Sequence, residues 1–106
     1  MIAVSQSEME IILGIIKKHV PDCDVLAFGS RLKWTHSDSS DLDLAVAGKE
    51  KFSIGTLSDI KEDFMESDIP YKVDVLDYLG VSPAFRGIID AGNERIYEGK
   101  VEGTHL

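Results

Sequence analysis

The sequence predicts a small α/β (α+β) domain in which a mixed β-sheet is flanked by helices. Two observations indicate this class. Segments with apolar residues at helical spacing alternate along the chain with short apolar or strictly alternating segments that are typical of strands. The length of 106 residues and the hydrophobic content of 43% suit one compact domain, expected over residues 1–98. The expected order of elements is helix, strand, short helix, strand, helix, strand, helix.

The first helix is expected to begin after Ser5 or Ser7, either of which can cap its N-terminus, and to end at Pro21. Its apolar residues recur at helical spacing, namely Met9, Ile12, Leu13, Ile16 and Val20. The short apolar run at 24–29, which closes with Gly, is too brief for a stable helix. It is therefore expected to be the first strand.

The next segment is expected to turn into a short helix at 30–34 and to continue as a polar loop at 35–40. Residues 41–47 read Asp-Leu-Asp-Leu-Ala-Val-Ala, which alternates over its first part and then becomes apolar. That pattern favours a second strand, buried at its end.

The following segment is expected to form the second long helix, opened by Ser53 or Thr56 and ending before Pro70. Leu57, Ile60, Phe64 and Met65 are expected to share its apolar face. An alternating strand follows at 71–76, and Asp77 is expected in the turn after it.

The C-terminal part begins with Ser82-Pro83, which has the cap-then-proline order of a helix start. This last helix carries Phe85, Ile88 and Ile89 before a glycine ends it, and a short edge segment is expected at 96–97. Residues 99–106 contain two glycines and little apolar content, so a flexible tail is expected there.

The composition argues against several classes of protein. A net charge of −8 is unfavourable for duplex DNA binding, and no stable nucleic-acid binding is expected. No apolar run approaches the roughly eighteen residues that span a bilayer, so no membrane association is expected. The N-terminus lacks the features of a secretory signal, and the single Cys23 can form no internal disulfide. Both features point to the cytoplasm.

Gly29-Ser30 is followed, after ten residues, by Asp41-Leu42-Asp43. Small residues at a strand end let backbone N–H groups approach a phosphate, and a helix beginning there adds its positive end. Carboxylates at alternate strand positions project from one face, roughly 6 to 7 Å apart. The segment therefore predicts a phosphate grip beside a magnesium site.

Asp74 interrupts apolar neighbours on the third predicted strand, where an isolated carboxylate is costly to bury. If that strand lies beside the second one, its carboxylate converges with Asp41 and Asp43. Each feature alone also has a structural explanation. A loop position or a solvent-facing strand edge accounts for the acids, and any turn from strand to helix favours Gly-Ser. The combination favours a metal site.

These elements resemble the GSx10DxD signature of the DNA polymerase beta-like nucleotidyltransferase superfamily, from Gly29-Ser30 through Asp41 and Asp43 to Asp74. The surroundings FGSR, SDLDLAV and VDVLD are similar to those of the minimal nucleotidyltransferase (MNT) antitoxins, which pair with HEPN toxins. Trp34 departs from the glycine of many members. The resemblance covers most of the chain.

The resemblance implies a Mg²⁺-dependent transfer of AMP from ATP to a hydroxyl, most often a tyrosine, of a HEPN toxin encoded nearby, with which the chain would form a hetero-oligomer. It implies that Gly29, Ser30 and Arg31 bind the nucleotide phosphates. Asp41, Asp43 and Asp74 would be the catalytic residues and would ligate metal, with two ions expected. Asp74 would also help to deprotonate the acceptor.

Two other functions remain open from the sequence. The domain could act without chemistry, as an antitoxin that masks its partner by stoichiometric binding through an acidic surface. It could also be a small-molecule nucleotidyltransferase of the antibiotic-modifying type, although the chain is short and shows no second substrate-binding domain.

Overall fold

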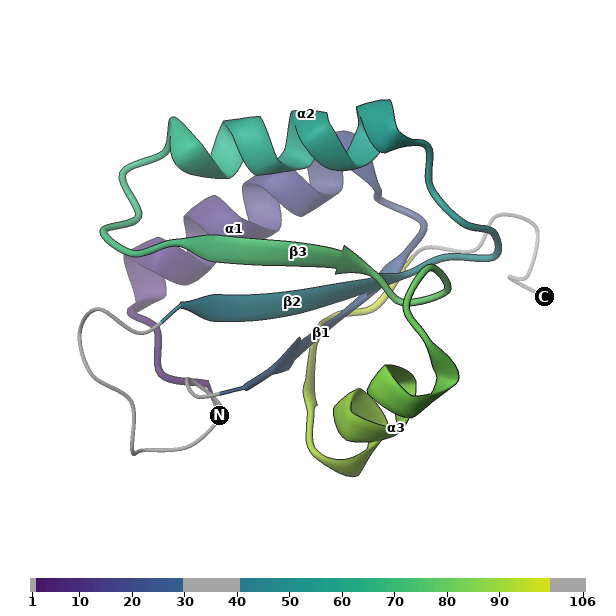
Figure 1. Cartoon of the computed structure of the whole chain (residues 1–106). Helices are drawn as coiled ribbons and strands as arrows, with labels where there is room; N and C mark the ends of the chain where they lie inside the picture. Colours follow the sequence, from purple (N-terminus) through teal and green to yellow (C-terminus); the bar gives the residue numbers. More distant parts are fainter. Residues whose placement is uncertain (1, 30–40, 100–106) are drawn as a thin grey trace, which may run out of the picture.

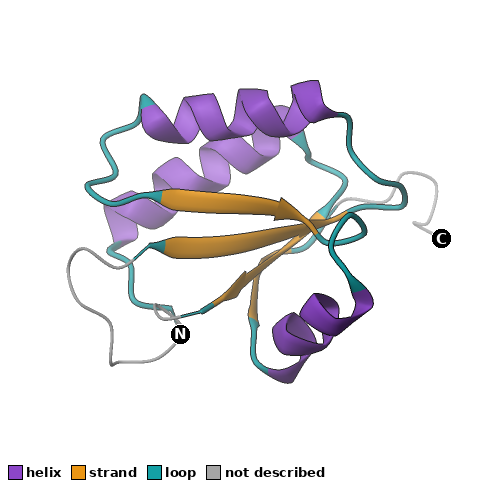
Figure 2. Ribbon diagram, in the orientation of Figure 1, coloured by secondary structure: helices purple, strands orange, loops and turns teal. Residues whose placement is uncertain are grey.

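The computed structural model describes residues 2–29 and 41–99 (Figures 1 and 2). Its elements are α1 (Gln6–His19), β1 (Asp24–Phe28), β2 (Leu42–Ala47), α2 (Ile54–Met65), β3 (Val73–Asp77), α3 (Pro83–Ala91) and β4 (Glu94–Tyr97). The predicted α/β class is confirmed, and the short segment expected at 96–97 belongs to β4. The expected short helix at 30–34, with Ser30, Arg31 and Trp34, lies outside the described residues.

The described strands form one mixed sheet in the order β3-β2-β1-β4. β2 pairs antiparallel with β1 and parallel with β3, and β4 pairs antiparallel with β1. Because parallel strands require a crossover connection, α2 carries the chain from the end of β2 back to the start of β3. Consequently β2 and β3 begin at the same end of the sheet, where β1 ends (Figure 1).

A serine caps the N-terminus of each described helix. Ser5 rather than Ser7 caps α1 in a reciprocal capping box: its Oγ accepts from Glu8 N at 3.1 Å and its N–H donates to Glu8 Oε1 at 2.9 Å. Ser53 rather than Thr56 caps α2, and Ser82 caps α3 with Pro83 in its first turn. The helix starts are thus determined by local side-chain chemistry, as the sequence predicts.

The main core lies between the sheet and the pair α1 and α2, which cover one face (Figure 2). Its residues include Ile12, Ile16, Val25, Ala27, Leu42, Leu44, Val46, Ile60, Phe64, Val73 and Val75. A smaller cluster of Phe28, Ala45 and Ile89 lies on the other face, beneath α3. Since successive strand residues point to opposite faces, Asp43 and Asp74 lie on the face that carries α3.

Two expectations about single residues were wrong. Met65 does not share the apolar face of α2, because its side chain is 85% exposed while Phe64 is buried. Consecutive residues of an α-helix point about 100° apart, so only one of this pair can face the core. Asp77 is not in a turn but ends β3, where it is buried and accepts hydrogen bonds from Phe52 N at 2.8 Å and Leu79 N at 3.1 Å.

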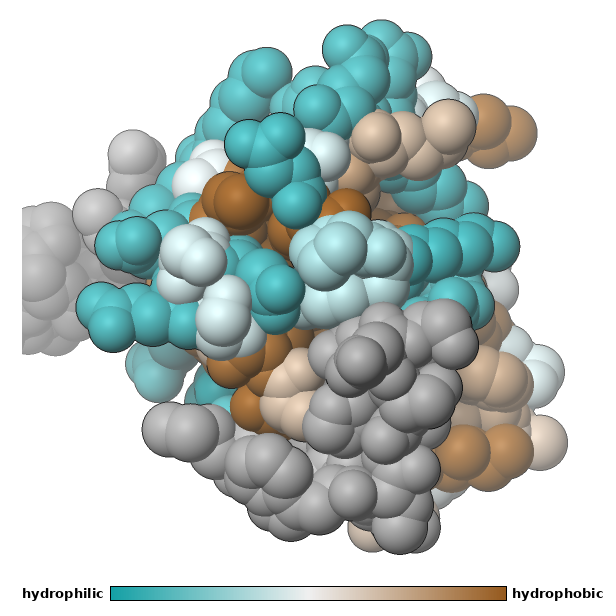
Figure 3. Space-filling view, turned by 90° about the vertical axis from the view of Figure 1, so that its left-hand side faces the viewer, coloured by the Kyte–Doolittle hydropathy of each residue, from teal (hydrophilic) through white to brown (hydrophobic). Residues whose placement is uncertain are grey.

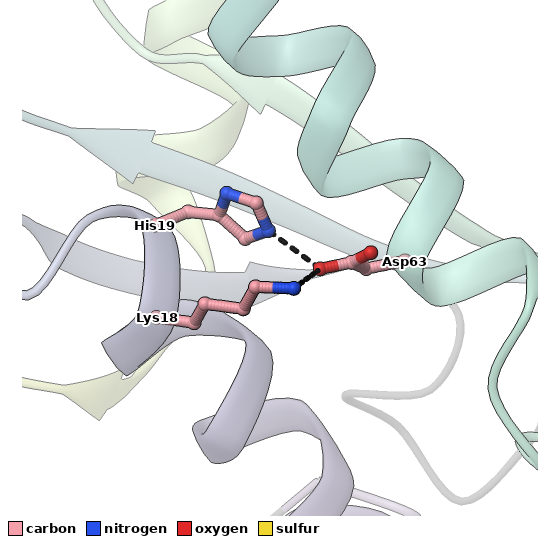
Figure 4. A network of polar contacts seen from close by, with 3 residues as sticks. All are labelled: Lys18, His19 and Asp63. Atoms are coloured by element: carbon pink, nitrogen blue, oxygen red, sulfur yellow. Dashed lines mark hydrogen bonds and ion pairs between the residues drawn. The ribbon is translucent and has the colours of Figure 1, made fainter.

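Three polar residues join α1 to α2 above the sheet (Figure 4). The same oxygen of Asp63, Oδ2, accepts from His19 Nε2 at 2.6 Å and from Lys18 Nζ at 3.1 Å. These contacts lower the pKa of Asp63 below its usual value. The hydrogen bond with His19 has the larger effect, and the hydrogen bond with Lys18 has the next largest. The contacts therefore favour the charged carboxylate in the folded protein.

Asp63→Asn is expected to lower the thermal unfolding midpoint at neutral pH, since the ionised carboxylate is bound more favourably in the folded state. A lowered folded-state pKa gives stability that is present above the unfolded pKa, near 3.9, and lost as the pH falls through the folded pKa. The difference from the wild type should therefore shrink in acid. Melting curves at pH 7 and pH 3 measure it, with Asp59→Asn on the exposed side of α2 as the matched control. An equal loss at both pH values would contradict an ionic contribution.

Among the described helices, none is long and apolar enough to cross a membrane.

Candidate active site

The candidate site lies where β1 ends and where β2 and β3 begin, at the left-hand end of the sheet in Figure 1. Asp43 is directly opposite Asp74 in the parallel register of β2 and β3. Neighbouring strands are about 4.8 Å apart, and both side chains point to the face opposite α1 and α2. Two of the three predicted carboxylates are therefore brought side by side.

Asp41, the third carboxylate, stands one residue before the start of β2 and is half-buried. It lies on the same face as Asp43 if the chain continues in strand geometry, since residues two apart share a face. Its negative charge contributes to the raised pKa of Asp43.

Gly29 follows the last residue of β1, and Phe28 is the direct partner of Asp43 across β1 and β2. Gly29 has a φ of 84°, which lies in the left-handed region that favours glycine. A Cβ at this position would overlap Oδ2 of Asp43 and lie 3.2 Å from Cγ. The backbone at Gly29 thus passes within contact distance of the carboxylate, a closeness that only glycine permits. Ser30 and Arg31, its predicted companions, lie outside the described residues.

The pKa of Asp43 is raised above its usual value. Burial of the carboxyl is the largest cause, followed by the negative charge of Asp74 and then that of Asp41. All three predicted acids therefore interact at Asp43, and a cation bound there would relieve both the repulsion and the desolvation.

Lys72 is a site residue that the sequence reasoning missed. Its Nζ lies 3.3 Å from Oδ1 of Asp74, on an exposed stretch of chain just before β3. The signal was present in the sequence, because residues two apart on a strand lie on the same face and Lys72 precedes Asp74 by two.

The chemistry of the site suits magnesium, which prefers carboxylate oxygens together with substrate phosphates and water. Asp43 and Asp74 supply such oxygens from adjacent strands. Within residues 2–29 and 41–99, however, no three His, Cys, Asp or Glu side chains already stand close enough to hold an ion. A bound metal would have to compete with Lys72 for Asp74.

Paired carboxylates beside a closely approaching glycine backbone can hold a cation next to a phosphate group. Residues 10–102 match the family described as Polymerase beta, Nucleotidyltransferase, and the chain belongs to this family. The family resemblance drawn from the sequence is confirmed.

One relative within this family is similar over most of the chain. The chain is 42% identical over 86 residues to the probable protein adenylyltransferase MntA of Haemophilus influenzae, covering 81% of this chain and 75% of the relative. This likeness agrees with the predicted similarity to MNT proteins.

Solved structures share the fold. A toxin–antitoxin crystal structure with AMP-PNP has a TM-score of 0.72 at 18% identity, covering 87% of this chain and 74% of the other. The structure of a tri-AMPylated HEPN toxin from Shewanella oneidensis in complex with its MNT antitoxin has a TM-score of 0.69 at 16% identity, covering 88% and 71%. At these identities the likeness supports the fold rather than shared detail of the sites.

Proposed function

We propose that the chain is a protein adenylyltransferase that transfers AMP from ATP to a tyrosine hydroxyl of a partner HEPN toxin and thereby acts as its antitoxin. The observation that carries this proposal is the register of Asp43 opposite Asp74 beside the left-handed Gly29. The relationship to MntA supplies the class of acceptor. The buried, free Cys23 suits a reducing cytoplasm, where ATP is available.

In this function the end of β1 holds the nucleotide. Backbone N–H groups at Gly29 and Ser30 would bind the β- and γ-phosphates, and Arg31 would contact phosphate. Asp41, Asp43 and Asp74 would hold the magnesium, with two ions proposed. Magnesium, when bound, would neutralise charge on the phosphates and on the acceptor oxygen.

The transfer forms a bond from the acceptor oxygen to the α-phosphorus and breaks the bond from that phosphorus to the oxygen bridging the β-phosphate. Pyrophosphate leaves with the electron pair of the broken bond. The proton of the acceptor hydroxyl passes to a carboxylate, a role we assign to Asp74. Its neighbour Lys72 pairs with this carboxylate, with Nζ 3.3 Å from Oδ1.

The sheet also gives the reaction a direction. Because β2 lies between β1 and β3, Gly29 is on one side of Asp43 and Asp74 is on the other. Attacking and leaving oxygens are roughly in line in such displacements. If pyrophosphate leaves toward Gly29, the acceptor arrives from the side of β3.

The test uses ATP labelled at the α-phosphate, Mg²⁺ and the HEPN protein encoded beside this chain. Wild type should transfer the label to the toxin, and the double variant Asp41→Asn/Asp43→Asn should transfer at least about a thousandfold less, since several kcal/mol of charge stabilisation are removed. Label transfer that survives the double substitution would sink the assignment. Mass spectrometry of the labelled toxin identifies the acceptor residue.

Stoichiometric masking is a second candidate, favoured by the exposed apolar side chains of α3, where Ile88 is 64% exposed and Phe85 37%. Such a surface suits a stable complex with the toxin. The double Asn variant separates the two functions. A masking antitoxin remains inhibitory after the substitution, whereas an enzymatic one loses inhibition together with transfer.

A further inference from the structure

A cavity of about 430 Å³ lies along the outer side of β3, the edge strand of the sheet. We call it the β3-edge cavity. Its walls come from the end of α2 and from the chain that leads into β3, with Lys61, Phe64, Ile69, Tyr71, Lys72 and Asp74 among its lining residues. The end of the molecule at which β2 and β3 begin faces the viewer in Figure 3, where brown apolar surface shows between teal hydrophilic atoms.

The floor of this cavity is apolar and its rim is charged. Phe64, Ile69 and Val73 are buried beneath it. Asp74 lies at one end and pairs with Lys72. Lys61 is exposed and has no ion pair within the described part of the chain. In a protein with a net charge of −8, an uncompensated lysine beside an apolar cavity favours an anionic group on whatever binds there.

Lys61 also lines a second cavity of about 320 Å³, farther along the same strand edge, with Lys51 and Leu76. The two cavities therefore share Lys61 and follow β3 from Asp74 toward its end. Their line suits an extended segment of chain better than an isolated small molecule.

The position of the β3-edge cavity matches the direction of the reaction. The acceptor is expected from the β3 side of Asp43, and Asp74 is both a lining residue of the cavity and the neighbour of Asp43. A cavity of this volume lies in the range of ligand pockets. Tyrosine combines an apolar ring with a polar tip, which fits an apolar floor at the edge of the strand that carries Asp74.

We propose that the β3-edge cavity is the acceptor subsite. It takes the ring of a tyrosine from an extended segment of the partner protein, with the hydroxyl toward Asp74, and Lys61 pairs with an acidic residue that flanks this tyrosine. This inference rests on the proposed function, and it adds a sequence preference for the acceptor.

The experiment measures KM for the HEPN protein and KM for ATP separately in AMP transfer. Lys61→Glu is expected to raise KM for the HEPN protein roughly fivefold to tenfold, and Lys61→Gln is expected to raise it less. KM for ATP and kcat should stay the same. Lys17→Glu is the matched control, since Lys17 is an exposed lysine on α1 that lines neither cavity.

Charge reversal on the partner sharpens the test. Each acidic residue near the modified tyrosine of the HEPN protein is changed to Lys in turn. The residue that pairs with Lys61 is the one whose Lys variant has a low KM with the Lys61→Glu enzyme but a raised KM with the wild-type enzyme. Added salt should raise KM for wild type more than for Lys61→Gln, because an exposed ion pair is screened.

The outcomes distinguish this inference from the function on which it rests. If wild type transfers no AMP to the HEPN protein, the proposed function fails and the acceptor subsite fails with it. If wild type transfers AMP but Lys61→Glu behaves like Lys17→Glu, the subsite is wrong and the function stands. A rise in KM for ATP instead of the HEPN protein would assign the cavity to the nucleotide and overturn the proposal.

Discussion

Asp43→Asn is expected to abolish AMP transfer while raising the thermal unfolding midpoint of the metal-free protein. The two effects share one cause. Asp43 is half-buried beside two other carboxylates, and its pKa is raised by burial, by Asp74 and by Asp41. The environment that opposes its negative charge is the one that attracts a cation.

The pH dependence of stability follows from the sign of this shift. A raised folded-state pKa means that ionised Asp43 opposes folding. The penalty begins as the pH rises above the unfolded value, near 3.9, and is complete above the folded pKa. The stability gained by Asp43→Asn should therefore be absent in strong acid and constant at neutral pH.

Melting curves in the presence of a chelator, from pH 3 to pH 8, measure this difference, and Asp59→Asn on α2 controls for the loss of one exposed charge. With Mg²⁺ in excess, the difference in melting temperature between Asp43→Asn and wild type should shrink or change sign. The ion stabilises only a protein that binds it in the folded state, and Asp43→Asn lacks one of the proposed ligands. Equal melting of wild type and Asp43→Asn at every pH would contradict the convergence of the three carboxylates.

Gly29→Ala is expected to damage both the fold and the activity. A left-handed backbone costs an L-residue roughly 1–2 kcal/mol, and the added Cβ would overlap Oδ2 of Asp43. The carboxylate and the end of β1 must therefore move apart. Because misplacement of reacting groups by about 1 Å can reduce a rate by around a hundredfold, AMP transfer should fall by about that factor.

Gly14→Ala is the matched control for this substitution. Gly14 lies within α1, and a Cβ there would meet nothing within 4 Å. Alanine should stabilise the helix by up to about 1 kcal/mol and leave the transfer rate unchanged. Denaturant unfolding and single-turnover transfer measure both variants. A Gly29→Ala protein with wild-type stability and rate would show that the close approach to Asp43 is unimportant.

Much of the fold was predictable because its signals are local. The serine that caps each helix acts on N–H groups within three residues, and the alternation around Asp43 needs only the period of a strand. The two wrong predictions concern residues whose burial depends on tertiary packing. Met65 continues an apolar series but points away from the sheet, and Asp77 follows a strand pattern whose polar end is buried by contacts with Phe52 and Leu79.

The candidate site likewise combines features that are local in the sequence with features that depend on tertiary packing. The order of residues along the chain specifies which side chains are available: a glycine at the end of one apolar run, two carboxylates at alternate positions of a second, and one carboxylate within a third. Contacts between distant parts of the chain place Asp43 opposite Asp74, pair Lys72 with Asp74, and form a cavity that Asp74 helps to line. Strand order and register depend on pairing between residues that are distant in the chain, whereas propensity, capping and alternation act within a few residues.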